Sequence, residues 1–241
     1  MESASSVFRL IIDPPRPAAL NMAIDEILMD AQKTPAALPS LRFYSWSSPA
    51  YSLGYFQDVR EVAARRRAAG KNIPVVRRIT GGGMVLHGKD LTFSLTLKST
   101  APFLPREVKG SYLRINEALR SGLAELLPEI DYASCKDVPS GRADGERVCF
   151  EAPSCYDLLL GRKKVVGSSQ RRKDGAVLHQ ASLFFDLDRE TMIDRISRGF
   201  EKQWGIFFRE IPLSDEELLR AEQRAEERYA SPEWAYQPLT V

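Results

Sequence analysis

The strongest constraint on the fold lies between residues 154 and 186, where three predicted strands are separated by two short turns. The strands cover residues 154–160, 163–171 and 176–186, and each turn contains a glycine. A turn of two or three residues joins neighbouring strands in antiparallel order. The chain is therefore expected to contain an antiparallel sheet.

Two long segments have the spacing of an amphipathic helix instead. In residues 18–32 apolar side chains recur every three or four positions, and Asp25 and Glu26 are expected to face away from the core. Residues 108–127 repeat this spacing with leucine and isoleucine. Long helices combined with hairpin strands favour an α+β fold. Because no Ser/Gly-rich linker divides the chain, we expect residues 1–241 to form a single domain, a mixed or antiparallel sheet flanked by helices.

Shorter elements complete the predicted organisation. Further strands are expected at residues 7–13, 41–46, 51–56, 74–80, 84–86 and 91–98. Asp58 can cap a basic helix that ends near Gly70, and residues 192–196 have a helical pattern. A capping box at residues 214–217 opens the last predicted helix. Residues 131–148 are polar and contain glycine, so a flexible loop is expected there.

Charge and hydropathy exclude several classes of protein. The formal net charge is +2, which gives no strong basic excess of the kind that nucleic-acid binding requires. No apolar run is long enough to span a bilayer, and the first residues lack the pattern of a secretory signal. We therefore expect a cytoplasmic protein that binds neither nucleic acid nor membrane.

The cysteines and histidines argue against a disulfide framework and a metal site. The chain has three cysteines, an odd number without a CxxC pair, and two histidines far apart in sequence. Reduced thiols are expected, with Cys135 and Cys155 structural and Cys155 at the start of a strand. His179 lies inside an apolar strand, where a hydrogen-bonded sheet histidine is the favoured interpretation.

Residues 77–87, Arg-Arg-Ile-Thr-Gly-Gly-Gly-Met-Val-Leu-His, form the first candidate site. Without a Cβ, the glycines at 81–83 permit positive φ and close approach of a ligand. The segment matches neither a phosphate-binding P-loop nor a dinucleotide fingerprint. A turn with a bulge is the alternative, and the neighbouring Arg77, Arg78 and His87 favour a ligand site.

Cys149 and Lys164 form the second candidate site. A thiol with an ordinary pKa near ~8.5 is only slightly ionised at neutral pH, and a lysine ammonium close by favours the nucleophilic thiolate. Lys164 begins a predicted strand soon after the loop that carries Cys149, whereas Lys163 is expected on the opposite strand face. The alternative for Cys149 is a small buried apolar residue.

Four motifs in order resemble the lipoate–protein ligase and octanoyltransferase family, whose catalytic domain is related to biotin–protein ligase. They lie at residues 21–26, 52–57, 77–87 and 161–172. Each motif alone is modest, and their common order makes the resemblance specific. It covers roughly residues 20 to 190 and implies the α+β fold of that catalytic domain.

Within this family the sequence is most similar to the cysteine-dependent octanoyltransferases of lipoate assembly. Their nucleophilic cysteine stands in a Cys-Phe-x-x-Pro-Ser loop, matched by residues 149–154. Their lysine falls on Lys164, but ATP-dependent ligases share it, so Cys149 is the deciding residue. The resemblance implies Cys149 and Lys164 as catalytic residues. The expected substrate-binding residues are Arg77, Arg78, Gly81, Gly82, Gly83, His87, Gly167 and Ser168.

Two positions depart from the family pattern. The usual Gln-His-Gly-Ser is replaced by His-Gln-Ala-Ser at residues 179–182, which puts a site role for His179 in doubt. Met84 stands where a small residue is usual and is a candidate for setting the depth of an acyl pocket.

The resemblance implies transfer of an octanoyl group from acyl carrier protein, through a thioester on Cys149, to a lysine of a lipoyl-domain protein such as the glycine-cleavage H protein. Both steps start from a thioester, so neither ATP nor a metal is expected as cofactor. Two alternatives stay open. One is an ATP-dependent lipoate or octanoate ligase in which Cys149 is incidental, and the other is a noncatalytic protein that binds lipoyl domains or acyl groups.

Overall fold

The computed structural model describes residues 6–58, 73–135 and 153–236, and within them the main sheet has six strands in the order β10-β11-β6-β2-β1-β12. The strands of this sheet are β1 (Val7–Ile12), β2 (Ser40–Tyr44), β6 (Leu91–Lys98), β10 (Val166–Lys173), β11 (Ala176–Leu183) and β12 (Phe207–Glu210). β10, β11, β6 and β2 pair antiparallel, and β1 pairs parallel with β2 and β12. The predicted α+β fold with a mixed sheet is confirmed.

Two smaller three-stranded sheets lie beside the main one. The first contains β3 (Ala50–Leu53), β4 (Val75–Arg77) and β5 (Val85–His87), and the second contains β7 (Ile130–Tyr132), β8 (Leu158–Leu160) and β9 (Lys163–Lys164). The predicted strand 163–171 is therefore divided at Val165. Its first part pairs with β8 and its second part with β11, so one chain segment links two sheets.

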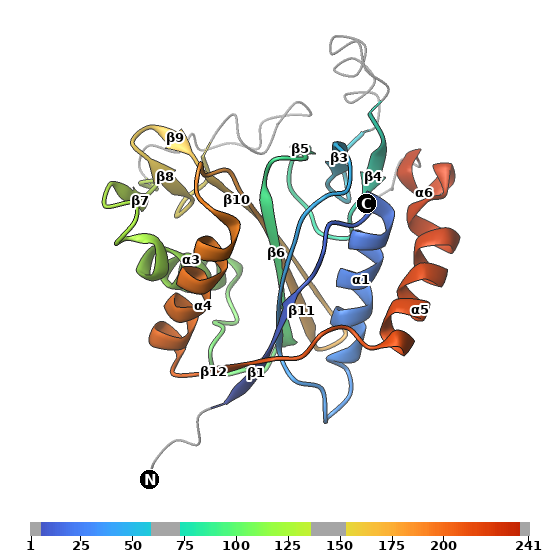
Figure 1. The fold of residues 1–241 in the computed structure, drawn as a ribbon, viewed down its shortest axis with the longest axis horizontal. Helices are drawn as coiled ribbons and strands as arrows, with labels where there is room; N and C mark the ends of the chain where they lie inside the picture. Colours follow the sequence, from blue (N-terminus) through green and yellow to red (C-terminus); the bar gives the residue numbers. More distant parts are fainter. Residues whose placement is uncertain (1–5, 59–72, 136–152, 237–241) are drawn as a thin grey trace.

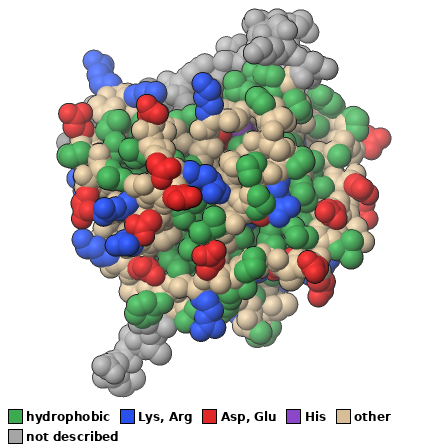
Figure 2. All heavy atoms as spheres, in the orientation of Figure 1, with side chains coloured by type: hydrophobic (Ala, Val, Ile, Leu, Met, Phe, Trp, Pro, Cys, Tyr) green, Lys and Arg blue, Asp and Glu red, His purple; other side chains and the backbone are tan. Residues whose placement is uncertain are grey.

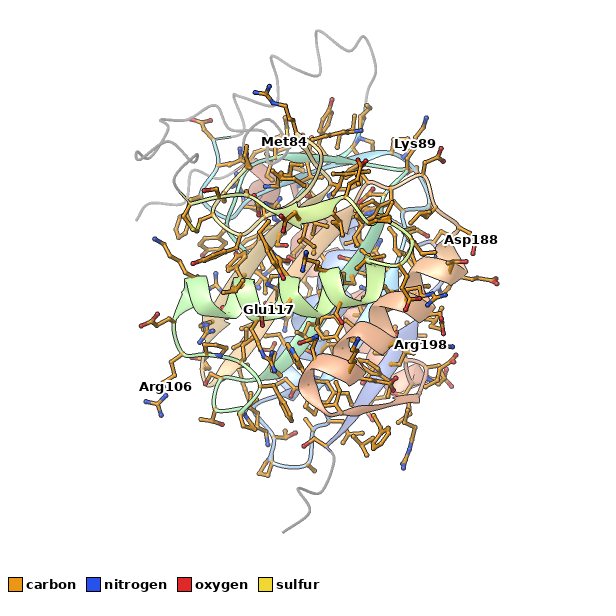
Figure 3. All side chains as sticks on the ribbon, turned by 90° about the vertical axis from the view of Figure 1, so that its left-hand side faces the viewer. Met84, Lys89, Arg106, Glu117, Asp188 and Arg198 are labelled. Atoms are coloured by element: carbon orange, nitrogen blue, oxygen red, sulfur yellow. A yellow bond between two sulfur atoms is a disulfide. The ribbon has the colours of Figure 1, made fainter. Side chains whose placement is uncertain are left out.

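Helices cover both faces of the main sheet (Figure 1). They are α1 (Ala18–Ala31), α3 (Val108–Leu123), α4 (Arg189–Trp204), α5 (Asp215–Arg224), the π-helix η1 (Ala225–Tyr229) and α6 (Pro232–Tyr236). α3 and α4 lie side by side on one face, with Glu117 and Arg198 on their outer side (Figure 3). α1 packs against the other face and is itself covered by α5 and η1.

The structure has helices where the sequence predicted them within the described residues, but some of their boundaries differ. α4 is longer than the predicted segment 192–196, and α3 ends before residue 127. The capping box at residues 214–217 is present, because Ser214 Oγ accepts from the Glu217 N–H and the Glu217 carboxylate accepts from the Ser214 N–H. The helix it opens is not the last one, since η1 and α6 follow. The basic helix predicted after Asp58 lies outside the described residues.

The two faces of the sheet differ in chemistry. Alternate residues of β6 point to opposite faces, so its leucines and Phe93 enter the apolar core under α3 and α4. Thr92 and Ser94 alternate with these residues and point to the opposite face, on the α1 side, where they are also buried. The helix that covers this polar face must supply polar partners, because buried polar groups without hydrogen bonds are costly.

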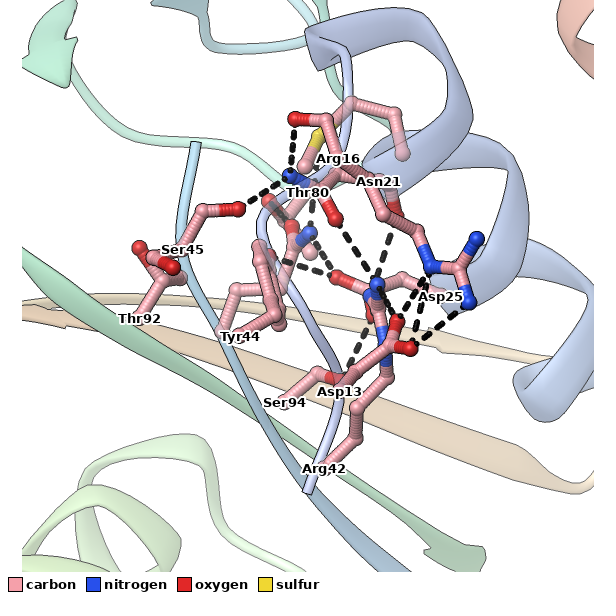
Figure 4. A network of polar contacts seen from close by, with 12 residues as sticks. Asp13, Arg16, Asn21, Asp25, Arg42, Tyr44, Ser45, Thr80, Thr92 and Ser94 are labelled. Atoms are coloured by element: carbon pink, nitrogen blue, oxygen red, sulfur yellow. Dashed lines mark hydrogen bonds and ion pairs between the residues drawn. The ribbon is translucent and has the colours of Figure 1, made fainter. Parts of the chain in front are cut away.

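α1 supplies these partners, which makes the predicted outward orientation of Asp25 and Glu26 wrong. Figure 4 shows Asp25 within the polar network. Asp25 is fully buried and pairs with Arg42 (Oδ1–Nη1 2.8 Å), whose guanidinium also pairs with Asp13 (2.6 Å). Asp25 accepts further hydrogen bonds from Ser94, Tyr44 and Gln180. Glu26 is also buried and accepts from the Tyr229 hydroxyl of η1.

A disulfide joins Cys135 and Cys155, so the expectation that both thiols are reduced is wrong. The backbone explains the pairing. Ala133 donates to the Asp157 carbonyl and accepts from the Tyr156 N–H, which brings the cysteine Cα atoms to 4.5 Å. Cys155 precedes β8 and does not begin it. Of the predicted flexible loop at 131–148, the first two residues belong to β7, and residues 136–148 lie outside the described part.

The surface carries no single-sign field on the face that Figure 2 shows, where basic and acidic side chains are interspersed. None of the helices in the described residues is long and apolar enough to cross a membrane. The same residues contain no group of three or more His, Cys, Asp or Glu side chains arranged to hold a metal ion.

Candidate functional site

A pocket lies where the polar face of the main sheet meets the small sheet of β3, β4 and β5. We call it the central pocket. Its lining residues are Met22, Tyr44, Trp46, Ser52, Arg78, Val85, His87, Thr92, Gly167, Ser168, Ser169, Gln180, Ala181 and Ser182. Its volume is about 20 Å³, close to the space that one water molecule needs. Four predicted site residues, Arg78, His87, Gly167 and Ser168, meet here.

The glycine segment packs tightly against the chain before β4. Gly82 has a φ of +85°, the positive value expected for this segment. A Cβ on Gly54 would stand 1.9 Å from the Gly82 carbonyl oxygen, so only glycine fits at position 54. Arg78 Nη2 donates to the carbonyls of Gly81 and Gly83, at 2.7 Å each. The loop is therefore held from inside by the guanidinium that lines the central pocket.

Arg77 lies on the other side of the strand from the pocket. Its Nη1 donates to three carbonyls, those of Gly54, Tyr55 and Gln57, and its remaining nitrogens donate to the carbonyls of Trp234 and Ala235. The side chain is fully buried. Arg77 thus ties the glycine segment to α6 and is absent from the lining of the central pocket.

His87 occupies the centre of a hydrogen-bonded chain. Its Nδ1 lies 2.7 Å from Asp90 Oδ2, and its Nε2 lies 2.7 Å from Ser52 Oγ. The ring stacks on Trp46, with centroids 3.9 Å apart. Burial lowers the pKa of His87, although Asp90 opposes this shift. The neutral ring therefore donates from Nδ1 to the carboxylate and accepts from the serine hydroxyl at Nε2.

Asp90 is the ionised member of this hydrogen-bonded group. Burial pushes the pKa of Asp90 up, but His87 and hydrogen bonds from the Gly88 N–H and the Thr92 hydroxyl bring it below its ordinary value. Thr92 in turn accepts from the Trp46 indole N–H. Neither Ser52 nor Asp90 was expected at the site, because the sequence places each within or beside an ordinary strand.

Thr80, Ser169 and Gln180 form a second polar cluster that the sequence did not reveal. Thr80 Oγ1 donates to Gln180 Oε1 at 2.6 Å and lies 2.9 Å from Ser169 Oγ. Gln180 Nε2 donates to Asp25 of the buried network. This cluster joins the glycine segment to β10 and β11 next to the pocket wall formed by Gly167 and Ser168.

Lys164 is buried near the pocket but does not line it. Its Nζ lies 2.6 Å from Asp157 Oδ2, and the same carboxylate oxygen accepts from the Ser154 N–H at 2.6 Å. Lys163 is exposed, which confirms that the two lysines point to opposite faces. The sequence did not predict Asp157 as the partner of Lys164. The pairing depends on how the segment just before β8 folds against β9.

Cys149, the predicted nucleophile, lies outside the described residues. His179 points into the core under α3 and α4, and neither ring nitrogen has a hydrogen-bond partner among the described residues. The expectation of a hydrogen-bonded sheet histidine is therefore wrong, whereas its neighbour Gln180 reaches the pocket. Met84 packs with Tyr51 and Leu53 in a separate apolar cluster and is not among the residues that line the central pocket.

Comparison with known proteins gives consistent matches. The model of the lipoyl protein ligase A/B catalytic domain matches residues 17–204. Octanoyltransferase LipM of Geobacillus kaustophilus is 30% identical over 97% of this chain and 99% of its own length. Octanoyltransferase LipM of Kyrpidia tusciae is 33% identical over 88% of this chain and 82% of its own length.

Solved structures share the fold. A bipartite lipoate protein ligase from Thermoplasma acidophilum superposes with a TM-score of 0.75 at 22% identity, over 98% of both chains. A lipoate-protein ligase A bound with ATP gives a TM-score of 0.75 at 24% identity, over 98% of this chain and 100% of the other.

Proposed function

Since this chain belongs to the lipoyl protein ligase A/B catalytic-domain family, we propose that it transfers an octanoyl group to a lysine of a lipoyl-domain protein through a thioester on Cys149. The relatives at 30% and 33% identity are octanoyltransferases of the LipM type, which supports acyl transfer as the reaction. The observation that carries the proposal is the buried Lys164–Asp157 pair. It holds an ammonium close to Ser154, which follows Cys149 by five positions in the sequence.

The geometry of this pair links Lys164 to Ser154, the end of the segment that contains Cys149. Asp157 binds both the Lys164 ammonium and the N–H of Ser154, and Ser154 is the last residue of the Cys-Phe-Glu-Ala-Pro-Ser segment. Cys149 precedes Ser154 by five positions. An ammonium held near this loop favours the thiolate form of the cysteine, which is the nucleophile in thioester exchange.

The reaction then has two balanced steps. The Cys149 thiolate attacks the donor thioester carbonyl, and the carbon–sulfur bond to the donor breaks, which releases the donor as a thiolate. In the second step the acceptor lysine amine attacks the acyl-enzyme and forms an amide, while the cysteine leaves as thiolate. The proton that the amine loses passes to the solvent, where it balances the proton taken up by the released donor thiolate. We propose acyl carrier protein as donor and the glycine-cleavage H protein as a candidate acceptor. No step requires ATP or a metal ion.

The central pocket is the proposed site for the acyl chain. It must widen to admit eight carbons, because its volume of about 20 Å³ holds only one water-sized group. Met22, an unbranched and flexible side chain, is the wall best able to move. Arg78, His87, Gly167 and Ser168 lie along this pocket and retain their proposed binding roles.

The second candidate function is an ATP-dependent lipoate or octanoate ligase. The fold is shared with a lipoate-protein ligase A bound with ATP, and at 24% identity this similarity is one of fold. In that reaction Lys164 and Arg78 would bind an acyl-adenylate and Cys149 would have no chemical role.

We also propose that residues 1–241 form one catalytic domain that acts in the cytoplasm.

An intact-mass experiment separates the two functions. The protein is incubated with octanoyl acyl carrier protein in the absence of ATP, and the proposal expects a covalent octanoyl adduct. Hydroxylamine should remove this adduct, because it cleaves thioesters. The Cys149→Ser variant should form either no adduct or a more stable ester that accumulates slowly. If the acceptor is modified only when ATP and free octanoate are supplied, the ligase is the correct function.

The lysine has its own test. Lys164→Met removes the ammonium but keeps most of the side-chain volume, and it should slow acyl-enzyme formation about 100-fold at neutral pH by reducing the thiolate fraction. The matched control is Lys163→Met, which removes an exposed lysine one position away. Equal rates in both variants would remove Lys164 from the mechanism.

A further inference from the structure

Ser52, His87 and Asp90 are arranged as a nucleophile, a base and an orienting carboxylate, an arrangement that the proposed transferase does not use. Ser52 Oγ lies 2.7 Å from His87 Nε2, and His87 Nδ1 lies 2.7 Å from Asp90 Oδ2. All three residues are buried, and Ser52 and His87 line the central pocket. Triads of this kind are recognised by their geometry and not by their order in the sequence.

One small sheet and the turn that follows it hold these residues. Ser52 and His87 come from neighbouring strands, because β3 pairs antiparallel with β5. Asp90 follows the turn after β5 and is held by the Gly88 N–H (3.0 Å) and the Thr92 hydroxyl (2.8 Å). Trp46 stacks on the His87 ring and fixes its plane. The base is therefore oriented by packing on one side and by an ionised carboxylate on the other.

A positive charge stands next to the serine oxygen. Arg78 Nη1 donates to Ser52 Oγ at 3.0 Å, and the same nitrogen donates to the Ser52 carbonyl. Ser52 Oγ thus accepts from the guanidinium while its own proton points to His87. This environment stabilises negative charge on the serine oxygen and on an oxyanion formed beside it.

The histidine borders a second space as well. His87 lines a cavity of about 720 Å³, the outer cavity, which is bordered by Pro49, Leu86, Lys89 and Phe184. This cavity is mostly apolar and much larger than the central pocket. Because His87 borders both, the outer cavity is the space available to the leaving group of an ester whose acyl group lies toward Ser52.

We propose that Ser52, His87 and Asp90 form a second acyl-transfer centre, independent of Cys149, that hydrolyses esters and thioesters of short acyl groups. The central pocket has a volume of about 20 Å³ and must widen for any acyl group, so groups of two to four carbons require less rearrangement than an octanoyl group.

Each step of this hydrolysis is balanced. Ser52 Oγ bonds to the acyl carbon as its proton moves to His87 Nε2, and the leaving group departs with that proton. Water then attacks the serine ester and gives a proton to His87. The acyl–oxygen bond breaks, Ser52 regains a proton from His87, and a carboxylic acid is released.

The test uses the full chain with Cys149→Ala, so that no result depends on the proposed transferase. The protein is treated with a fluorophosphonate, and the labelled peptide is identified by mass spectrometry. We expect the label on Ser52. Hydrolysis of p-nitrophenyl acetate and butyrate should fall about 100-fold or more when Ser52→Ala or His87→Ala is added.

The matched control is Ser197→Ala. Ser197 is a buried serine of α4 whose hydroxyl has no hydrogen-bond partner among the described residues, and it lines neither the central pocket nor the outer cavity. This variant should keep both the label and the hydrolysis rate. The proposal is overturned if the fluorophosphonate leaves Ser52 unlabelled. This result is decisive because the labelled protein, Cys149→Ala, keeps Ser52, His87 and Asp90 intact. It is also overturned if Ser52→Ala hydrolyses the esters as fast as its parent.

Discussion

His179 gives a quantitative test of the core under α3 and α4. Its ring is fully buried between Phe93 and Tyr112, and neither nitrogen has a hydrogen-bond partner in the described part of the chain. Burial lowers the pKa of His179 to about 3. A neutral imidazole without partners costs roughly 1–3 kcal/mol. The substitution His179→Leu removes this cost at similar volume and should stabilise the protein at pH 7.

The pH dependence follows from the direction of the shift. Between the ordinary pKa near ~6.5 and about 3, the unfolded chain binds a proton at His179 that the folded chain does not. The stability linked to the neutral His179 ring is therefore fully present above the pKa of the unfolded state. It is lost as the pH falls toward the pKa of the folded state. From pH 7 to pH 5 the loss is about 2 kcal/mol, at about 1.4 kcal/mol for each pH unit below the unfolded pKa.

Urea unfolding at pH 7 and pH 5, followed by circular dichroism, measures this difference. The advantage of His179→Leu over the parent protein should grow by about 2 kcal/mol between the two pH values. The control Val177→Ala changes a buried, non-titrating residue on the same face of β11. It should lower the free energy of unfolding by the same amount at pH 7 and pH 5. If the advantage of His179→Leu is equal at pH 7 and pH 5, the burial of a neutral histidine is refuted.

Two further predictions concern local geometry. Gly54→Ala should destabilise the protein by about 1–3 kcal/mol, because its Cβ would meet the Gly82 carbonyl oxygen at 1.9 Å. Thermal unfolding measures this, and Gly81→Ala, which meets no atom within 4 Å, should change little. Thiol titration in denaturant should find one free thiol per chain before reduction and three after it, because Cys135 and Cys155 are joined. Three thiols before reduction would contradict the disulfide.

The sequence predicted the parts of the fold that local patterns determine. The hairpins of β8 to β11, the helices α1 and α3 and the capping box of α5 follow from turn residues, spacing and cap chemistry. The exposure of Asp25 and Glu26 was predicted incorrectly, because a helix pattern cannot show that the sheet face beneath it is polar. That information lies in β2, β6 and β11, far away in sequence.

The candidate site was predicted in the same uneven way. Arg78, His87, Gly167 and Ser168 were expected from their motifs and do line one pocket. Ser52 and Asp90 were not expected, since their roles arise from strand pairing and a turn that bring them to His87.

The pairing of Lys164 with Asp157 and that of Cys135 with Cys155 were missed for one reason. Each depends on how the chain from β7 to β9 folds back on itself. In this region Ala133 exchanges backbone hydrogen bonds with the segment just before β8. Residue spacing carries no signal for such a contact.

In the proposed mechanism an octanoyl group passes through Cys149 on its way to the acceptor lysine. The most direct measurement isolates the octanoylated protein from its donor and mixes it with an acceptor lipoyl-domain protein, without ATP, in a single turnover. We expect the octanoyl mass to leave Cys149 and to appear as an amide on the acceptor. An acyl-enzyme that persists, or that only hydrolyses while the acceptor stays unmodified, would contradict it.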